Sequence, residues 1–542
     1  MSPTSYHCST PPADGRATVR IGQTFGVGYN AAGFAPSRPV LTDARLRTPM
    51  AVNPKKLRPY DQPPKVRSPI IPNAPDSAAT AFLVAALVWF LIAAGLGLVW
   101  VAIQLFPSQL TFSLEMPTLR GTLKFVLSPT TVSSGFSNAL YYGWLGNAGL
   151  GAIFFITPRL LGHRLADETW ASLSAGLWNV GLVAGLVVLY VPQLTVGGTL
   201  TELPLPVDGV LLLALLLANA SFFRTLLAAK DQLPYVSLWY FGVSLLALLG
   251  LYGLISLVPL VHLSATAAAL ANGFYVRALQ TLVVSGIAIG TLYYVIPRAA
   301  LNPLYSWGVA MLGWLLWLGL STLAPLASLV DTSVPFPITQ LGNVATILLV
   351  APTFLVVANL LLSISGRWTL ILSPGTVPFA VVAATFLVAT SLLEAVGSLG
   401  SVRALVGGTE WVTGVQIFAL LGTATLAFLA LADHAFPRLL RRDWGGTLLA
   451  EATLWAAFAG AALAGLALIA GGIAHGSLVA GGATAEKIDG TLFWFRLVLG
   501  AGLGLTALAA LIVNLNVFLM YTSARPAQYA VIGEAAVTPA AH

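Results

Sequence analysis

Ile156-Thr157-Pro158-Arg159 closes a long apolar segment, and the Pro-Arg pair at its end occurs twice more in the chain. Pro297-Arg298 and Pro437-Arg438 close two further apolar segments, so that the three pairs are 139 and 140 residues apart. A regular period of this length indicates one structural unit used three times. A membrane span takes about 20 residues, so each period has room for about four helices with their loops. The spacing therefore predicts three repeated four-helix units.

The composition indicates an integral membrane protein. The 542 residues are 57% hydrophobic and 8% charged, whereas soluble domains have roughly 25% charged residues. Twelve apolar stretches are long enough to cross a hydrocarbon core of about 30 Å, and they are too long and too uniformly apolar for barrel strands. We therefore expect an all-α bundle. The stretches are 78–106, 131–157, 169–192, 207–229, 235–261, 263–296, 304–330, 341–365, 373–397, 411–436, 446–472 and 492–520.

The distribution of positive charge predicts the domain boundaries and the orientation. Ten of the 26 lysines and arginines lie in residues 1–77, a proline-rich stretch that we expect to be a disordered, basic cytoplasmic tail. Met50 offers a second start codon, which leaves open whether 1–49 belong to the protein. Residues 78–520 are the expected membrane domain and 521–542 a second short disordered tail. Loops after even-numbered helices carry nine basic residues and loops after odd-numbered helices four, which predicts that both termini are cytoplasmic.

Motifs on the second, fifth, sixth and tenth expected helices point to a family. They read FSNALYYGWLGNA at 136–148, YVSLWY at 235–240, LYYVIPR at 292–298 and TEWVTG at 409–414. Together they resemble subunit I of the haem–copper oxidases, specifically the C-family, cbb-type cytochrome c oxidases. The similarity extends from about residue 78 to 472. It implies an integral membrane fold of twelve helices in three pseudo-symmetric four-helix arcs.

In that family six histidines bind the redox centres, because neutral imidazole is a strong ligand for haem iron and copper. One on the second helix and two on the tenth bind two b-type haems, and one on the sixth and a pair on the seventh bind copper. Counting from the Pro-Arg pairs places these positions, and that of the family's modified tyrosine, without gaps. The residues found there are Phe136, Arg277, Ala327, Ser328, Val415, Ile417 and Ser321. None is a haem or copper ligand, so we expect no haem, no metal and no catalytic residue.

Charged residues inside the expected bundle form a second candidate site. Arg277 lies within the sixth helix, where an uncompensated charge is costly. Glu394 on the ninth helix matches a glutamate that the family keeps near its active site, and we expect Arg277 and Glu394 to form a buried ion pair, directly or through water. The alternative is that Arg277 extends to the outer interface and pairs with nothing. Glu410 is interpreted as the start of the tenth helix, and Asp433 and His434 as solvated residues at its end.

These residues favour a redox-inactive paralogue of oxidase subunit I that acts as a structural or assembly subunit of a membrane respiratory complex. The resemblance implies a bacterial or archaeal inner membrane and partners that include c-type cytochrome subunits, with lipid around the helices; nothing indicates nucleic acid. Two alternatives stay open. An active oxidase, from cytochrome c to oxygen, would need displaced ligands such as His262 and His475. A transporter, proton path or quinone-binding subunit would use the vacated cavity around Arg277 and Glu394.

Overall fold

The fold is known from a computed structural model that describes residues 72–522, except for short gaps at 119–120, 197, 199, 230–233, 262, 331 and 445. Twelve of its helices are long and apolar enough to cross a membrane, as predicted. Ser77 already begins the first helix and Thr522 ends the last, so both expected tails begin slightly farther out. Residues 72–76 of the first expected tail are described, whereas 1–71 and 523–542 lie outside the described residues.

Each of the three repeats contributes four spans. The first four are α1 (Ser77–Leu105), the continuous run α3 (Pro129–Asn138), η1 (Ala139–Gly146) and α4 (Asn147–Leu161), then α5 (Glu168–Leu189) and α6 (Leu205–Ala228). The next four are α7 (Val236–Ser256) with η2 (Val258–Leu260), the run α8 (Ala265–Ala278), η3 (Leu279–Val284) and α9 (Ser285–Ala300), then α10 (Trp307–Leu323) with η4 (Ala324–Leu329), and α11 (Phe336–Leu348) with α12 (Val350–Leu362). The last four are α13 (Thr376–Gly397), the run α15 (Glu410–Ile417), η6 (Phe418–Ala424) and α16 (Thr425–Leu440), then α17 (Thr447–Ala480) and α18 (Ala485–Thr522). Three short helices, α2 (Pro107–Leu110), η5 (Trp368–Ile371) and α14 (Gly400–Val406), lie in connections.

The second, sixth and tenth spans are the inner helices of the bundle. Their most apolar windows are 94%, 89% and 94% buried, compared with 33% to 61% for the other nine spans. Each contains a π segment, and the three segments η1, η3 and η6 begin at residues 139, 279 and 418. The sequence repeat therefore coincides with a repeated change of helical geometry in the three helices that the protein buries most.

The Pro-Arg pairs mark the ends of these inner helices. Each pair is followed by a residue with positive φ, which is Gly162 at 67°, Leu301 at 50° and Arg441 at 55°. The next backbone N–H then donates to the carbonyl of the proline, at 3.1 to 3.2 Å in all three cases. This left-handed turn satisfies carbonyls that a helix end leaves open. The repeated sequence thus produces the same helix stop three times.

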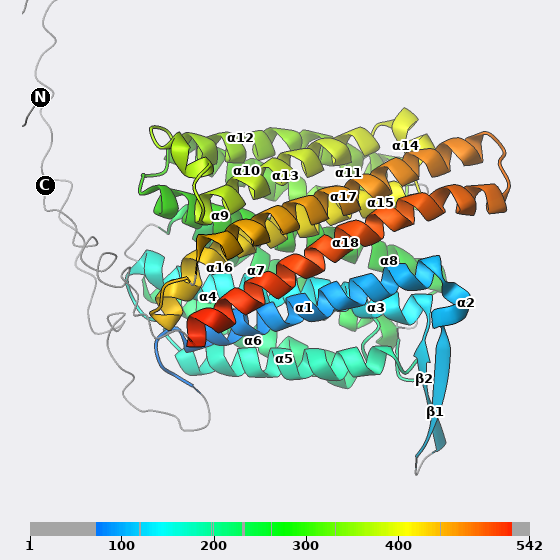
Figure 1. Cartoon of the computed structure of the whole chain (residues 1–542), viewed down its shortest axis with the longest axis horizontal. Helices are drawn as coiled ribbons and strands as arrows, with labels where there is room; N and C mark the ends of the chain where they lie inside the picture. The colour runs from blue at the N-terminus through cyan, green and yellow to red at the C-terminus, as the bar shows by residue number, and fades with distance from the viewer. Residues whose placement is uncertain are drawn as a thin grey trace, which may run out of the picture. The chain divides into compact units, whose positions relative to one another are not determined.

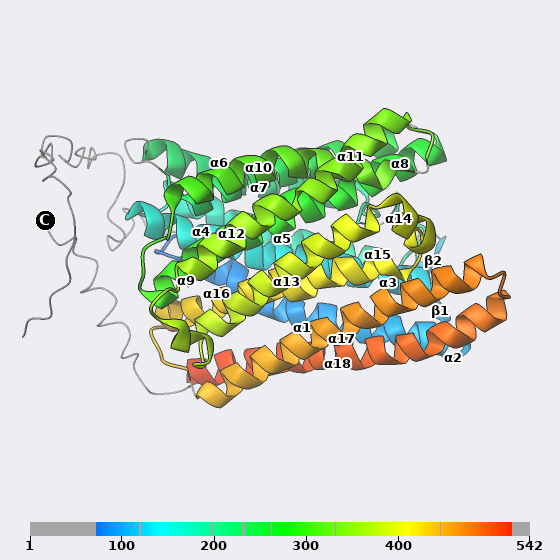
Figure 2. The ribbon, with the colours of Figure 1, turned by 90° about the horizontal axis from the view of Figure 1, so that it is seen from above.

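Figures 1 and 2 show the spans lying roughly side by side. The ends of α4, α9 and α16 that carry Arg159, Arg298 and Arg438 lie together on the left of Figure 1, and we call this side the Pro-Arg end. The opposite side is called the distal end. At the distal end the structure adds one element to the expected all-α fold, an antiparallel hairpin of β1 (Phe112–Thr118) and β2 (Gly121–Leu127) between the first two spans.

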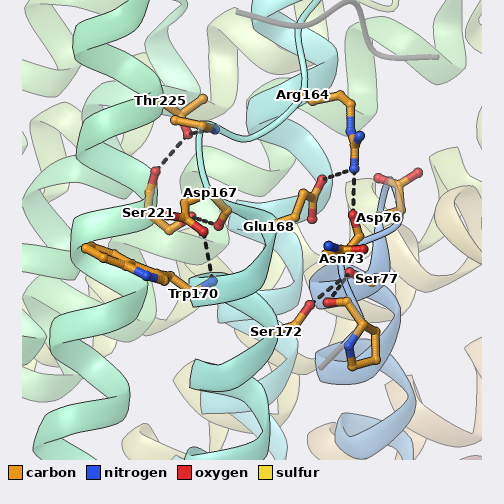
Figure 3. A network of polar contacts seen from close by, with 12 residues as sticks. Asn73, Asp76, Ser77, Arg164, Asp167, Glu168, Trp170, Ser172, Ser221 and Thr225 are labelled. Carbon is orange, nitrogen blue, oxygen red and sulfur yellow. Dashed lines mark hydrogen bonds and ion pairs between the residues drawn. The ribbon is translucent and has the colours of Figure 1, made fainter. Parts of the chain in front are cut away.

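Polar contacts at the Pro-Arg end hold the residues that precede α1 (Figure 3). Asp76 receives two hydrogen bonds of 2.8 Å from Arg159. Arg164 donates to the carbonyl of Asn73 at 2.8 Å, and its guanidinium lies 4.0 Å from the carboxylate of Glu168. Arg164 and Glu168 are both buried, with side chains 3% and 8% exposed. The start of the membrane domain is therefore tied to the second and third spans.

Candidate functional site

The predicted ligand positions on the inner helices lie at equivalent points of the repeat. Phe136 is in the last turn of α3, Arg277 in the last turn of α8, and Val415 and Ile417 in the last turn of α15. Each of these turns continues directly into a π segment. Single π turns inside α-helices are rare and occur frequently at functional sites. The structure therefore gives these four positions a common local setting that their sequences do not share.

Apolar side chains occupy the positions on the second and tenth spans. Phe136 is 8% exposed and stacks on Trp100 of α1, with ring centroids 5.5 Å apart. Its ring also lies against Gly97, where an added Cβ would be only 3.0 Å away. Val415 and Ile417 are buried on α15. These side chains fill space and have no atom that could coordinate iron.

The position on the sixth span carries a charge that is paired. Nη1 of Arg277 lies 2.7 Å from Oε1 of Glu394 on α13, and Nε2 of Gln280 donates to the same oxygen at 3.3 Å. The side chains of Arg277 and Glu394 are 17% and 11% exposed. The structure thus brings the two residues into direct contact and does not leave Arg277 unpaired at an interface. This contact joins the sixth span to the ninth.

The positions on the seventh span lie beside α8. Ser321 on α10 is 1% exposed. The hydroxyl of Thr281 donates to the carbonyls of both Arg277, at 3.0 Å, and Ser321, at 3.5 Å. Ala327 and Ser328 lie in η4, which packs against α8, and the hydroxyl of Ser328 donates to a carbonyl of its own turn at 2.8 Å. The expected copper and tyrosine positions are therefore neighbours in space, and the hydroxyl of Ser328 is bonded to the protein backbone.

These side chains do not fit the haem and copper groups of the family. Phenylalanine, valine, isoleucine and alanine offer no ligand atom, and the guanidinium of Arg277 stays cationic and would repel copper. In the part of the chain that the structure describes, no group of three or more His, Cys, Asp and Glu side chains could hold a metal ion. His475 is hydrogen-bonded to Glu410 at 2.8 Å, a pair that the interpretation of Glu410 as a helix start did not include. His262 lies outside the described residues.

The end of the tenth span corrects one expectation. We expected both Asp433 and His434 to be solvated. His434 is instead buried, because the inner helices meet at this level, whereas Asp433 is partly buried. His434 is 6% exposed, and its ring stands edge-on to Phe155 and Tyr294 at centroid distances of 6.4 and 5.7 Å. Asp433 accepts a hydrogen bond of 2.6 Å from Thr376. His434 therefore belongs to the packed core of the Pro-Arg end, and Asp433 lies at its edge.

Several buried oxygen atoms around the ion pair lack a hydrogen-bond partner among the described residues. They are Oε1 of Gln280, Oγ of Ser321 and Oη of Tyr141. Tyr141 also lines a cavity of about 20 Å³, together with Leu279 and Val283. Such a cavity can hold one water molecule, which needs roughly 10–15 Å³, but it is far smaller than the roughly 300–1,000 Å³ of a ligand pocket. Internal water is the simplest partner for these oxygens.

The fold and the inner helices define a twelve-span membrane protein built on a threefold repeat. Residues 77–524 match the family model described as Cytochrome C and Quinol oxidase polypeptide I. The chain belongs to this family, which confirms the resemblance to haem–copper oxidase subunit I.

Individual relatives agree with this assignment. The chain is 24% identical over 472 residues to the Cbb3-type cytochrome c oxidase subunit CcoN1 of Stutzerimonas stutzeri, covering 83% of this chain and 95% of that protein. It is 23% identical over 358 residues to cytochrome c oxidase subunit 1 of Rhodobacter capsulatus, covering 63% of this chain and 66% of the relative. A chain of a heme-copper terminal oxidase dimer, solved by cryo-EM, has the same fold with a TM-score of 0.67 at 13% identity, over 83% of this chain and 84% of that one.

Proposed function

We propose that this chain is a redox-inactive relative of oxidase subunit I that serves as a structural or assembly subunit of a membrane respiratory complex. One observation carries the proposal. Counting from the Pro-Arg pairs predicts that the family's six histidine positions and its tyrosine position are occupied by residues other than histidine and tyrosine. These residues are Phe136, Arg277, Ala327, Ser328, Val415, Ile417 and Ser321. The described residues contain twelve candidate membrane spans, and these positions lie on or beside them. A protein that keeps the scaffold without the ligands can still present subunit I surfaces to partner chains.

The position of the ion pair supports this proposal. Arg277 stands where the family has a copper ligand, and Glu394 neutralises its charge at 2.7 Å. The paired guanidinium in this place joins the sixth span to the ninth. We propose that the Arg277–Glu394 pair stabilises the bundle in place of the metal site.

The proposed partners and location come from the relatives and the charge distribution. The relative in Stutzerimonas stutzeri is named as a subunit of a cbb3-type cytochrome c oxidase. We extend this to the present chain as a proposal: its partners are respiratory subunits, including c-type cytochromes, in a bacterial or archaeal inner membrane. The excess of basic residues in the loops at the Pro-Arg end supports an orientation with both termini in the cytoplasm.

A reduced-minus-oxidised absorption spectrum with pyridine haemochrome quantification tests the proposal directly. The purified full-length protein should contain no stoichiometric haem, while CcoN1 from Stutzerimonas stutzeri, produced and purified in the same way, serves as the positive control. One or two haems b per chain would overturn the proposal and restore the oxidase function with displaced ligands. In that case the variants His262→Ala and His475→Ala would identify the ligands.

The unpartnered oxygens favour a second candidate function, a path for protons or another small polar solute through the vacated region. Gln280, Ser321 and Tyr141 each present a buried oxygen that is free to bond to water near the Arg277–Glu394 pair. Proteoliposomes with an internal pH dye would then show proton flux that the Glu394→Gln substitution reduces. Flux equal to that of protein-free liposomes would eliminate proton conduction and leave the structural function.

A further inference from the structure

The β1–β2 hairpin has one apolar face. Alternate residues of a strand point to opposite sides, and the antiparallel register places apolar residues of both strands opposite one another. The three cross-strand pairs on this face are Phe112 with Leu127, Leu114 with Phe125 and Met116 with Leu123. The opposite face carries Ser113 and an exposed Glu115–Lys124 ion pair with 3.9 Å between the charged atoms. The hairpin is therefore an amphipathic ribbon.

The β1 half of this apolar face is largely exposed among the residues that the structure describes. Phe112 and Leu114 are each 57% exposed and Met116 is 41% exposed. A two-stranded hairpin is at best marginally stable alone in water and needs packing on its apolar face. Three large apolar side chains at alternate positions of one strand, all exposed on the same face, indicate a contact with another apolar phase.

The other half of the same face shows which way the ribbon is turned. Phe125 stacks on Tyr190, the residue that ends α5, with ring centroids 5.4 Å apart. Phe125 and Leu127 also pack against a small buried cluster that contains Ile103 of α1 and Val132 of α3. The backbone N–H of Val126 donates to the carbonyl of Tyr190 at 2.8 Å. The apolar face is thus directed toward the distal ends of the membrane spans.

The orientation of the hairpin relative to the helix axes determines which environment its exposed apolar side chains face. Figure 1 shows β1 and β2 at the distal end, running across the helix axes and extending beyond α5 at the edge of the bundle. A segment that crosses the axes of transmembrane helices at their ends runs along the membrane surface. The exposed side chains of β1 lie on the same face as Phe125 and Leu127 of β2, which contact helix ends. The apolar face therefore lies at the level of the membrane surface.

We propose that the β1–β2 ribbon lies on the distal surface of the lipid bilayer. Phe112, Leu114 and Met116 insert into the boundary between headgroups and acyl chains, where amphipathic segments bury their apolar faces about 5–10 Å deep. The Glu115–Lys124 pair stays in water on the other side. The ribbon then extends the contact of the subunit with lipid beyond its helices, on the side opposite to the Pro-Arg end. This inference does not depend on whether the protein binds haem.

Site-directed spin labelling of the full-length protein in phospholipid nanodiscs tests the proposal. Cys8 is the only cysteine, so Cys8→Ser provides a background without reactive thiols. Nitroxides are attached at Leu114→Cys and, as the matched control, at Ser113→Cys, the neighbouring residue on the opposite face. The expected result is higher accessibility to oxygen and lower accessibility to a water-soluble nickel complex at position 114 than at position 113. Met116→Cys should repeat the pattern of position 114.

Two outcomes would overturn the proposal. Equal accessibility to the nickel complex at positions 113 and 114 would mean that the apolar face lies in water. Protection of position 114 from both oxygen and nickel would mean that a protein, either a second copy or a partner chain, covers it in place of lipid. Each labelled protein must elute as a single species at the position of the unlabelled chain, and Met116→Cys provides the same test if Leu114→Cys does not.

Discussion

The substitution Glu394→Gln tests whether the ion pair between the sixth and ninth spans stabilises the bundle. The carboxylate accepts hydrogen bonds from Arg277 at 2.7 Å and from Gln280 at 3.3 Å. Glutamine keeps the size of the side chain but removes its negative charge. Arg277 is then left with an uncompensated charge inside a membrane helix. We expect the variant to be less stable than the wild-type protein.

The magnitude follows from the burial of the pair. Removing one partner of a fully buried ion pair costs about 3–5 kcal/mol, because the remaining charge is uncompensated. The side chains of Arg277 and Glu394 retain 17% and 11% exposure. Partial hydration lowers the expected cost of Glu394→Gln to about 2–3 kcal/mol. The double variant Arg277→Met/Glu394→Gln should recover most of this loss, since it also removes the uncompensated charge of Arg277.

Equilibrium unfolding of the purified protein in mixed micelles, titrated with SDS and followed by circular dichroism, measures these differences. The matched control is Asp489→Asn, which breaks the pair between Asp489 and Arg496. The charged atoms of this pair are also 2.7 Å apart, but Asp489 is 71% exposed. Exposed pairs contribute about 0–1 kcal/mol, so the control should change stability little.

The reasoning would be refuted if Glu394→Gln cost no more than Asp489→Asn. A double variant as unstable as the single one would also contradict it, because the loss would then come from the missing carboxylate and not from the uncompensated charge. Either result would mean that the charge of this ion pair does not stabilise the folded protein.

Two further substitutions test the packing of the inner helices in the same unfolding assay. Gly143→Ala should lower the free energy of unfolding by about 1–3 kcal/mol through overpacking, because the added Cβ would lie 2.6 Å from the Trp89 ring. Gly95→Ala is the control and should lower it by nothing, because no atom lies within 4 Å of the added Cβ. Equal stability of the two variants would contradict the close approach of α1 and η1. Trp144→Phe should cost about 1 kcal/mol, because it removes the buried 2.9 Å hydrogen bond to Thr425, and an unchanged stability would contradict a contribution from that bond.

The number of spans could be predicted from the sequence because a membrane span needs only a local property, an apolar stretch of about 20 residues. The boundaries were less accurate where a helix continues beyond the lipid. The eleventh helix was expected to end at residue 472, but α17 continues to Ala480. Helix formation requires backbone hydrogen bonds and packing, which do not stop where the apolar stretch does. The Pro-Arg pairs, in contrast, marked the ends of the inner helices closely, since a left-handed turn follows each of them.

The hairpin could have been found but was not. Phe112, Leu114 and Met116 alternate with less apolar residues, which is the period of a half-buried strand. The segment is short and lies between two long apolar helices, whose helical hydrophobic pattern is much stronger than its alternation. Its orientation could not have been predicted, because this depends on the contact of Phe125 with Tyr190.

Taken alone, the sequence was sufficient to determine the membrane class, the twelve spans and the threefold repeat, and it predicts which residues stand at the family's ligand positions. These properties depend on local hydrophobic length and on counting from repeated motifs. Only the tertiary structure decided that Arg277 and Glu394, 117 residues apart, are 2.7 Å from each other, and that His434 is buried. Contacts of this kind depend on how distant helices pack, and charge alone does not specify which neighbour a side chain will meet.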